Sequence, residues 1–462
     1  MSRKGDGGLA GTQGRRPNLL FVFADQLRAD AVGCAGNPDV RTPHLDALAA
    51  EGMYFTHALA NCPVCTPSRG TILTGRYPLA HGAASNDLPL GEGERTFGHL
   101  LGEAGWRTGY IGKWHLDGIP RDRFTPPGPR RRGFEYWAAW NCSHAYFRGR
   151  YFRDEPEPVA IEGYEPDGQT DLALEFIRER RAEPWALFLS FGPPHNPYPQ
   201  VPERYRAMYD PDRVTLRGNA VAADRRTVAD YYAAITALDD NLGRLLHLVD
   251  ELGLKEDTIV VYTSDHGDML FSHGMKEKQK PFEESIRVPL AVRYPRAVAA
   301  GQRSDALIST VDLLPTLLGL AGVSAPENVQ GTDLSAHLRG LPCALPESTF
   351  LLNPIPVDNP ADVGQGEWRG VRTARYTYAA GLAGPWVLYD DVADPLQQHN
   401  LVNDPDQAGA RDHLQAMLGQ WLRRTDDRFL PWPEHIHACG LAELWNVRER
   451  AMHPKEPRLV DA

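Results

Sequence analysis

Four segments of the chain are apolar at nearly every position and end abruptly in polar side chains. They cover residues 17–24, 107–112, 185–191 and 258–263. Strands of this kind are buried on both faces, as they are in parallel sheets. Between them, Thr42–Glu51 and Val228–Leu252 carry apolar residues at the spacing of amphipathic helices. The alternation predicts an α/β fold with a doubly wound, mostly parallel sheet.

Polar residues that can carry chemistry follow each of these segments. They are Asp25 and Gln26, then Lys113, Trp114 and His115, then His195, and finally Asp265 and His266. In a doubly wound sheet, ligands bind beyond the carboxyl ends of the strands. The pattern therefore predicts one composite site, assembled from residues that are far apart in the sequence.

The pattern changes after Pro342. Residues 367–379 and 385–389 have the character of short antiparallel strands, and the apolar spacing over Ala408–Arg424 predicts an amphipathic helix. The first residues of the chain are polar and rich in glycine. We therefore expect three regions: a disordered leader over residues 1–16, an α/β catalytic domain over 17–342, and a smaller α+β domain over 343–462.

Composition narrows the class of partner. The chain of 462 residues has 49 Lys and Arg against 60 Asp and Glu, a formal net charge of -11. Without a basic excess, general binding to nucleic-acid phosphates is not expected. No apolar run approaches the ~20 residues that span a bilayer, and the N-terminal segment lacks the apolar stretch of a secretory signal. Six scattered cysteines do not make a disulfide framework. We expect reduced thiols, a cytoplasmic location and no membrane partner.

Two cysteines, Cys62 and Cys65, stand three positions apart in the stretch NCPVCTPSRG. The spacing fits a redox pair, half of a zinc site, or one reactive sulfur beside a buried one. A structural zinc site needs a second Cys/His pair, and the remaining cysteines are scattered. We therefore interpret Cys62 as a small buried hydrophobic residue.

The residues that follow Cys65 set it apart. The run CTPSRGTILTG, residues 65–75, resembles the type I sulfatase signature C-[S/T/A/C]-P-[S/T/A]-R, which is followed by two apolar residues and T-G. In that family the cysteine is converted after translation to formylglycine, whose hydrated aldehyde is the nucleophile. The resemblance implies that Cys65 is a substrate of a formylglycine-generating enzyme.

The local sequence around Cys65 suits this chemistry. Proline is tolerated in the first turn of a helix, so Pro67 predicts a helix over Ser68–Leu73. The positive end of that helix would stabilise an anionic ester. Arg69 adds a fixed charge beside the nucleophile, suited to sulfate oxygens and to orienting the diol.

Two residue pairs are candidate ligands of a divalent metal, Asp25-Gln26 and Asp265-His266. Dispersed carboxylates brought together by a sheet suit a hard cation such as calcium or magnesium. Sulfatases usually have Asp-Asp and Asp-Asn at these places, so this site is less negative and is open to manganese or another nitrogen-tolerant metal. We expect one divalent ion, calcium first, held by the four residues of these pairs and by residue 65.

A second segment, GWRTGYIGKWH over residues 105–115, resembles the other sulfatase signature, which ends in G-K-x-H. Trp106 stands where Tyr or Val is commoner. The resemblance implies that Lys113 binds a sulfate oxygen, and that His115 contacts the nucleophile and helps to eliminate sulfate.

Two further catalytic residues follow from family motifs. His195, in PPHNPY, matches the P-H-x-P histidine, which implies a proton donor near the bridging oxygen. Residues 278–287 match the register K-x-x-x-[Y/F]-E-x-x-x-R. That register assigns Lys278, and not Lys276 or Lys280, to the sulfate pocket.

The resemblance covers nearly the whole chain, including VDLLPTLLGLAG at residues 311–322 and the C-terminal segments 368–378 and 388–401. It implies an alkaline-phosphatase-like fold and hydrolysis of a sulfate monoester, of a carbohydrate or an aryl alcohol, through a covalent sulfo-enzyme. Two alternatives stay open: a phosphodiesterase or phosphonate monoester hydrolase of the same superfamily, and a metal-binding or redox-active protein in which Cys65 remains a thiol.

The substrate is indicated only by the segment 136–152, which is rich in aromatic residues and arginines. These residues either form a rim that stacks a sugar or aryl ring, with Asn141 or His144 donating hydrogen bonds, or pack a loop onto the domain. A small-molecule or carbohydrate sulfate ester is the expected partner.

Overall fold

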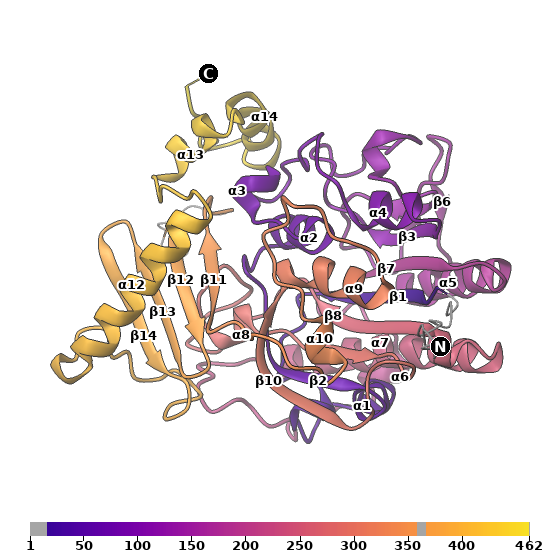
Figure 1. The fold of residues 1–462 in the computed structure, drawn as a ribbon, viewed down its shortest axis with the longest axis horizontal. Coiled ribbons are helices and arrows are strands. Elements are labelled where there is room, and N and C mark those ends of the chain that lie inside the picture. The colour runs from indigo at the N-terminus through magenta and orange to yellow at the C-terminus, as the bar shows by residue number, and fades with distance from the viewer. Residues whose placement is uncertain (1–15, 358–365, 462) are drawn as a thin grey trace, which may run out of the picture.

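The computed structural model describes residues 16–357 and 366–461. Of the predicted leader, only Arg16 lies within this range. An eight-stranded sheet with the order β10-β2-β9-β8-β1-β7-β3-β4 occupies the larger part of the molecule (Figure 1). Its strands are β1 (Asn18–Asp25), β2 (Met53–Leu59), β3 (Arg107–Lys113), β4 (Tyr136–Trp140), β7 (Trp185–Pro194), β8 (Thr258–Ser264), β9 (Ala291–Arg293) and β10 (Gln302–Ser309).

The sheet is mostly parallel, as predicted. Strand β9 runs antiparallel to β2 and β8, and the other neighbouring pairs are parallel. The four apolar segments of the sequence form β8, β1, β7 and β3, which are direct neighbours. Because parallel neighbours end at the same edge, the polar residues that follow these four strands are brought together.

Helices cover both faces of the sheet, which makes it doubly wound. Helices α1, α5, α6 and α7 pack on one face, and α2, α4 and α9 pack on the other. Their bounds, with those of the shorter helices, are α1 (Pro43–Ala50), α2 (Cys65–Thr74), α3 (Pro78–His81), α4 (Phe97–Glu103), α5 (Glu165–Arg180), α6 (Glu203–Arg206), α7 (Arg225–Glu251), α8 (Glu283–Ile286), α9 (Leu313–Ala321) and α10 (Ser335–Leu338).

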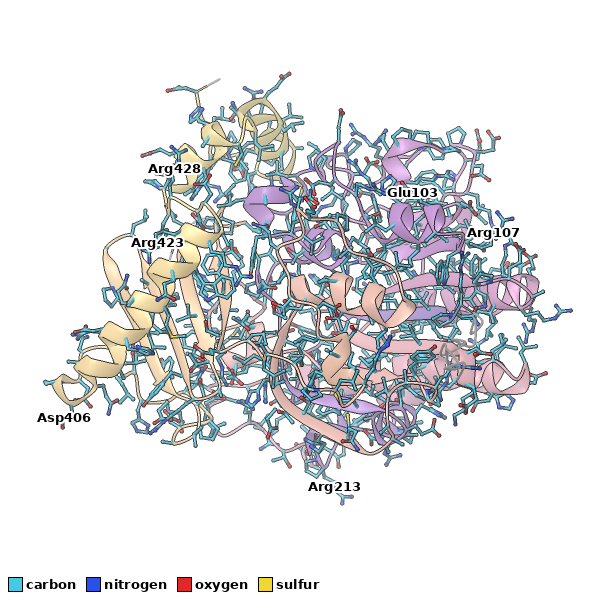
Figure 2. The ribbon with its side chains drawn as sticks, in the orientation of Figure 1. Glu103, Arg107, Arg213, Asp406, Arg423 and Arg428 are labelled. Carbon is cyan, nitrogen blue, oxygen red and sulfur yellow. The ribbon has the colours of Figure 1, made fainter. Side chains whose placement is uncertain are left out.

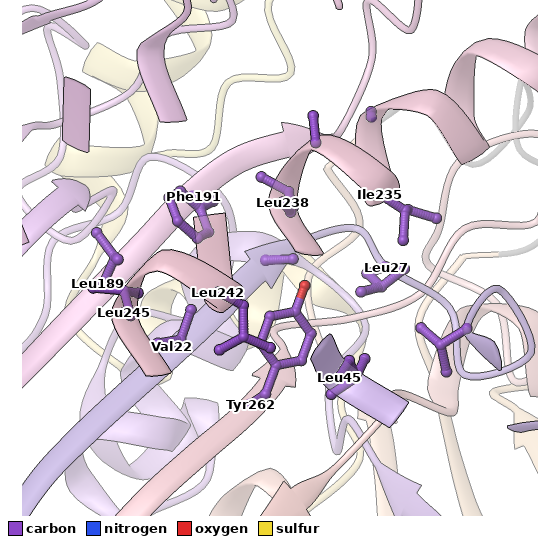
Figure 3. Close-up of a cluster of buried hydrophobic side chains, with 14 of the residues drawn as sticks. Val22, Leu27, Leu45, Leu189, Phe191, Ile235, Leu238, Leu242, Leu245 and Tyr262 are labelled. Carbon is purple, nitrogen blue, oxygen red and sulfur yellow. The ribbon is translucent and has the colours of Figure 1, made fainter. Parts of the chain in front are cut away.

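Strand β1 shows why nearly continuous apolar runs are needed. Leu20 and Val22 belong to the core beneath α7, whereas Phe21 and Phe23 belong to the core on the opposite face. Successive residues of a strand point to opposite sides, so a strand covered on both sides is apolar at every position. Figure 3 shows Val22 beside Leu242 of α7 in the first of these cores.

The C-terminal part is built around a four-stranded antiparallel sheet, β11-β12-β13-β14 (Figure 1). Helix α12 packs on one face, and the other face packs against the larger part of the molecule. The sequence predicted antiparallel strands over 367–379 and 385–389 and the helix α12; the first segment forms two strands, β12 and β13, and β11 was not predicted. The elements are β11 (Ser348–Asn353), β12 (Trp368–Thr373), β13 (Tyr376–Gly381), β14 (Gly384–Asp390), α12 (Ala408–Arg424), α13 (Trp432–Ala438) and α14 (Ala442–Met452).

Most charged side chains project from the outside, as the labelled Glu103, Arg107, Arg213 and Asp406 do in Figure 2. A small two-stranded sheet, β5 (Arg150–Tyr151) with β6 (Val159–Ala160), lies beside β4, and Phe152 after β5 exchanges backbone hydrogen bonds with Ala139 of β4. Among the described residues, no helix combines the length and the hydrophobicity that crossing a membrane requires.

Candidate active site

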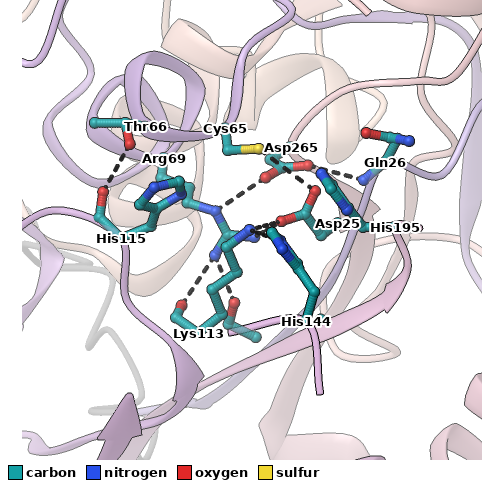
Figure 4. Close-up of polar contacts among 12 residues, drawn as sticks. Asp25, Gln26, Cys65, Thr66, Arg69, Lys113, His115, His144, His195 and Asp265 are labelled. Carbon is teal, nitrogen blue, oxygen red and sulfur yellow. Dashed lines mark hydrogen bonds and ion pairs between the residues drawn. The ribbon is translucent and has the colours of Figure 1, made fainter. Parts of the chain in front are cut away.

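Cys65 is the first residue of α2 and is buried, with 1% of its surface exposed. The helix begins earlier than the predicted Ser68, because Cys65, Thr66 and Pro67 already have helical backbone and Pro67 fits the first turn. Cys62 is also buried, in an apolar cluster with Val64, as its interpretation required. Of these two cysteines, Cys65 is the one that faces the polar groups of the site (Figure 4).

Three other candidate metal ligands lie close to the Cys65 sulfur. The Sγ atom lies 3.6 Å from Asp25 Oδ1 and 3.2 Å from His266 Nε2. His266 Nε2 is in turn 3.6 Å from Asp25 Oδ1 and 3.6 Å from Asp265 Oδ1. One ligand atom from each of these four residues lies within 4.8 Å of the others, and all four residues are buried.

The electrostatics of this cluster fit a divalent cation. Burial, together with the neighbouring Asp25, raises the pKa of Asp265. Two buried carboxylates at this separation repel each other, and a bound cation would relieve both the repulsion and the loss of hydration. Two carboxylates and one imidazole nitrogen suit calcium, magnesium or manganese, and the Cys65 sulfur stands where formylglycine would place oxygen.

Gln26, the remaining predicted ligand, has a left-handed backbone with φ of 68°. Its amide nitrogen donates to Asp268 Oδ2 at 2.8 Å, and this contact fixes which way the amide points. Its Oε1 accepts a hydrogen bond from Lys278 Nζ at 2.8 Å. The oxygen of Gln26 therefore faces the same space as Lys278 and the Cys65 sulfur.

Arg69 forms ion pairs with both carboxylates, those of Asp25 and Asp265. Its Nη2 lies 3.0 Å from Asp25 Oδ2, and its Nε lies 2.9 Å from Asp265 Oδ2. Its Nη1 donates to the Lys113 carbonyl at 2.9 Å and to Ser190 Oγ at 2.7 Å. A planar guanidinium with three engaged nitrogens locks both Asp side chains in orientation.

Two ammonium groups flank residue 65. Lys113 Nζ lies 2.5 Å from Asp25 Oδ2. Lys278 Nζ lies 3.2 Å from Cys65 Sγ and 2.8 Å from His195 Nε2. Burial raises the pKa of the Cys65 thiol, but Lys113, Lys278 and His266 outweigh it and hold that pKa well below its usual value. The surroundings therefore stabilise negative charge at this position.

His115 is held by an acidic partner. Its Nε2 donates to Asp87 Oδ1 at 3.0 Å, and the same carboxylate is bound by Arg121 at 2.8 and 2.9 Å. Burial lowers the pKa of His115, but the Cys142 thiol and Asp87 outweigh it and raise that pKa to about 10. This histidine is poised to hold a proton beside residue 65.

His195 has the opposite character. Its Nδ1 donates to the Asn196 carbonyl at 2.8 Å, and its Nε2 accepts from Lys278 at 2.8 Å. Burial and the adjacent Lys278 lower the pKa of His195 to about 3. Its ring stacks on His144 with centroids 4.2 Å apart and planes within 1°.

The aromatic segment mostly packs the fold. Trp137 is buried against Tyr110, and Trp140 stacks on Phe152 at 4.8 Å. Asn141 is used internally, because its amide donates to the Gly118 carbonyl at 2.7 Å. His144 alone among the expected contact residues reaches the site, with Nε2 3.4 Å from Lys113 Nζ (Figure 4).

Sequence reasoning missed several residues that shape the site. A polar residue inside the apolar run WALFLSF was a signal for Ser190, and the pattern DHGD was one for Asp268. Asp87 and Arg121 lie in loops with no periodicity, so their sequence context carried no comparable signal. The predicted residues Asp25, Gln26, Cys65, Arg69, Lys113, His115, His195, Asp265, His266 and Lys278 all lie in this one region.

The fold and the site define a hydrolase of the alkaline phosphatase superfamily, and comparison with known proteins assigns the family. The Sulfatase family profile matches residues 17–323. The profile of the C-terminal part of N-sulphoglucosamine sulphohydrolase matches residues 272–424. The chain belongs to the sulfatase family and is a sulfuric ester hydrolase.

The chain is similar to an ulvan-active sulfatase from Formosa agariphila, with 38% identity over 424 residues that span 90% of this chain and 82% of the relative. It is also similar to a solved structure from work on glycosaminoglycan metabolism by Bacteroides thetaiotaomicron. That pair has a TM-score of 0.83 and 27% identity, covering 92% and 99% of the two chains. A phosphonate monoester hydrolase from Agrobacterium radiobacter shares the fold, with a TM-score of 0.73 and 24% identity over 88% and 96% of the chains.

Proposed function

We propose that this enzyme hydrolyses sulfate monoesters of carbohydrates, with formylglycine derived from Cys65 as the nucleophile. The supporting observation is the position of Cys65 at the start of α2, 3.2 Å from both Lys278 Nζ and His266 Nε2. Conversion by a formylglycine-generating enzyme is part of the proposal, and it rests on the C-T-P-S-R run.

The charges around residue 65 suit one tetrahedral monoester. A sulfate ester repels an anionic nucleophile unless its oxygens are neutralised. Lys113 and Lys278 are buried cations on either side of the sulfur, and the N-terminal end of α2 adds a positive dipole. Fixed positive groups in a site without bulk water stabilise the charge that develops in the transition state.

Asp25, Asp265, His266 and residue 65 would hold the divalent ion, with the Gln26 oxygen as a further donor. We propose calcium, because carboxylate and amide oxygens dominate this set. The bound ion would supply charge neutralisation to a sulfate oxygen. Arg69 serves this centre by fixing both carboxylates.

Proton transfer is divided between two sides of the site. The hydrate of formylglycine supplies one hydroxyl for attack on sulfur and a second whose deprotonation expels sulfate. Lys278 and His195 share a proton across 2.8 Å and donate it to the departing oxygen. His115 acts in its neutral form: its Nδ1 accepts the proton of the second hydroxyl, and Asp87, which accepts from Nε2, stabilises the imidazolium that results.

The carbohydrate class is supported by the relative from Formosa agariphila, which acts on ulvan. His144 lies at the mouth of the site, half-buried and stacked on His195. We propose that it contacts the sugar that carries the sulfate. A small sulfated oligosaccharide is therefore a better candidate substrate than a simple aryl sulfate.

One observation favours a second candidate, a phosphonate monoester hydrolase. The pairs Asp25-Gln26 and Asp265-His266 depart from the usual sulfatase pairs, and a phosphonate monoester hydrolase shares the fold. The deciding experiment compares one preparation, coexpressed with a formylglycine-generating enzyme, on ulvan oligosaccharides, nitrophenyl sulfate and a phenyl phosphonate ester. We expect the largest kcat/KM on a sulfated oligosaccharide. Faster turnover of the phosphonate ester would overturn the proposal.

A further inference from the structure

The loop between α3 and α4 is fixed by the C-terminal helix pair α13–α14. Ala84 and Leu88 of this loop are buried in one apolar cluster with Ile436, Leu441 and Trp445. The helix pair lies beyond residue 424, outside the segments that match the two family profiles. The chain thus adds its own support to a loop of the larger part of the molecule.

A buried arginine reinforces this contact. Arg448 of α14 is 1% exposed, and its Nε donates to the Asn86 carbonyl at 3.2 Å. Arg448 also pairs with the buried Glu449, whose other partner is Arg458. Arg458 in turn donates to the Val357 carbonyl at 2.6 Å. Contacts on both sides therefore hold the Arg448 guanidinium in place.

The side chains of Asn86 and Asp87 in this loop contact the proposed catalytic residues. Asn86 Oδ1 accepts from the Thr66 N–H in the first turn of α2, at 3.0 Å. Thr66 Oγ1 donates to the His115 carbonyl at 2.9 Å. Asp87 Oδ1 accepts from His115 Nε2 at 3.0 Å. The same loop therefore positions both the helix that begins at Cys65 and the His115 ring.

The backbone of Asp87 and of His115 is in an unfavourable conformation that neighbouring residues must stabilise. Asp87 has φ of 65° and His115 has φ of 56°, both in the left-handed region. Residues other than glycine persist there only where the surrounding structure holds them. Asp87 is held by its own N–H, which donates to Thr66 Oγ1, and by Arg121, which binds its carboxylate. The preceding Asn86 carbonyl is held by Arg448.

We propose that the helix pair α13–α14 is part of the active-site scaffold. Through Arg448 and the apolar cluster it holds the loop 82–88, and Asp87 is thereby the positioning residue of His115. The inference rests on the proposed role of His115 in the expulsion of sulfate. It assigns a catalytic consequence to a C-terminal helix pair that supplies none of the predicted catalytic or metal-binding residues.

Full-length variants test this proposal. In Arg448→Met, we expect kcat to fall about tenfold, as for other residues that orient a catalytic group, with KM unchanged. The matched control is Arg450→Met, on the exposed side of the same helix, which should behave as wild type. In the double variant Arg448→Met/Asp87→Ala, the loss of kcat should be smaller than the product of the two single losses, because both changes act on the position of His115. Additive losses would overturn the proposal.

Hydrogen–deuterium exchange gives a readout that does not depend on activity. We expect faster exchange over residues 82–90 in Arg448→Met than in Arg450→Met, and equal exchange would overturn the proposal. If Arg448→Met does not fold, Trp445→Phe replaces it, because this change removes the indole N–H that donates to the Arg458 carbonyl at 2.7 Å and reduces the buried ring that lies against the Arg448 guanidinium. If the wild type hydrolyses no sulfate ester, the proposed function fails, and exchange alone decides this inference.

Discussion

Lys278 Nζ lies 2.8 Å from His195 Nε2, and the two side chains come from segments 83 residues apart. The His195 Nδ1–H donates to the Asn196 carbonyl, which leaves Nε2 as the acceptor of the Lys278 proton. The pair therefore presents a proton toward residue 65 from a buried ammonium. In the proposed mechanism, this pair would combine charge stabilisation with protonation of the leaving group.

Replacing Lys278 tests that unit. We expect Lys278→Met to lower kcat by about 100-fold or more, because it removes a buried charge that faces the developing anion. Lys276→Met is the matched control, since Lys276 is exposed and its ammonium lies over the Phe271 ring instead. Steady-state kinetics on a sulfated oligosaccharide check both variants. Equal losses in the two would contradict the assignment of Lys278.

Cys65→Ser should yield an enzyme that is trapped or very slow. A serine hydroxyl can attack sulfur, but it lacks the second hydroxyl that expels sulfate. Intact-protein mass spectrometry after incubation with substrate should detect an added sulfo group. Cys343→Ser, at an exposed position, should retain full turnover and carry no adduct. Sustained turnover by Cys65→Ser would count against the mechanism.

Removing a carboxylate should remove the metal. We expect the wild type to bind one equivalent of a divalent ion, and Asp265→Asn to bind much less, because the remaining donors are fewer and less negative. Metal analysis by inductively coupled plasma mass spectrometry measures this directly, with the exposed Asp212→Asn as control. Chelation of the wild type should abolish activity, and added calcium should restore it. Full activity of the metal-free protein would refute the assignment.

Glu165 predicts a pH dependence of stability. Burial raises the pKa of this carboxyl from 4.5 to about 8, and its Oε1 accepts from Gln169 Nε2 at 2.6 Å. Between pH 4.5 and about 8 the folded state holds a proton that the unfolded state has lost. The free energy of unfolding therefore falls as pH rises through this window, by at most about 1.4 kcal/mol per pH unit.

The isosteric change Glu165→Gln should remove this dependence. Its stabilisation relative to wild type should be small near pH 4.5 and should grow up to about pH 8. Urea denaturation at a series of pH values measures it. Glu162→Gln, at an exposed position three residues earlier, should show no such trend. A pH-independent difference for Glu165→Gln would show that its carboxyl is ionised in the folded state.

Particular residues show which features of the protein could be predicted from its sequence. Apolar runs that end in Asp25, Lys113, His195 and Asp265 were enough to predict a doubly wound sheet with one composite site, because parallel strands end at a common edge. The short motif around Cys65 was enough to predict the reactive position. Such signals are formed by residues that are adjacent in the sequence, so they can be recognised without knowing the tertiary structure.

Other features depend on contacts between distant segments. The pairing of Asp87 with His115, the hold of Asp268 on Gln26 and the contact of Arg448 with the Asn86 carbonyl come from loops and a terminal helix. Loop residues have no periodicity to place them, and a buried charge shows its role only when its partner is known. The sequence by itself determined the sheet and the family resemblance, and it singled out Cys65 as the residue that we propose to be reactive. Only the tertiary structure decided which side chains orient them, because orientation depends on distances that the order of residues does not contain.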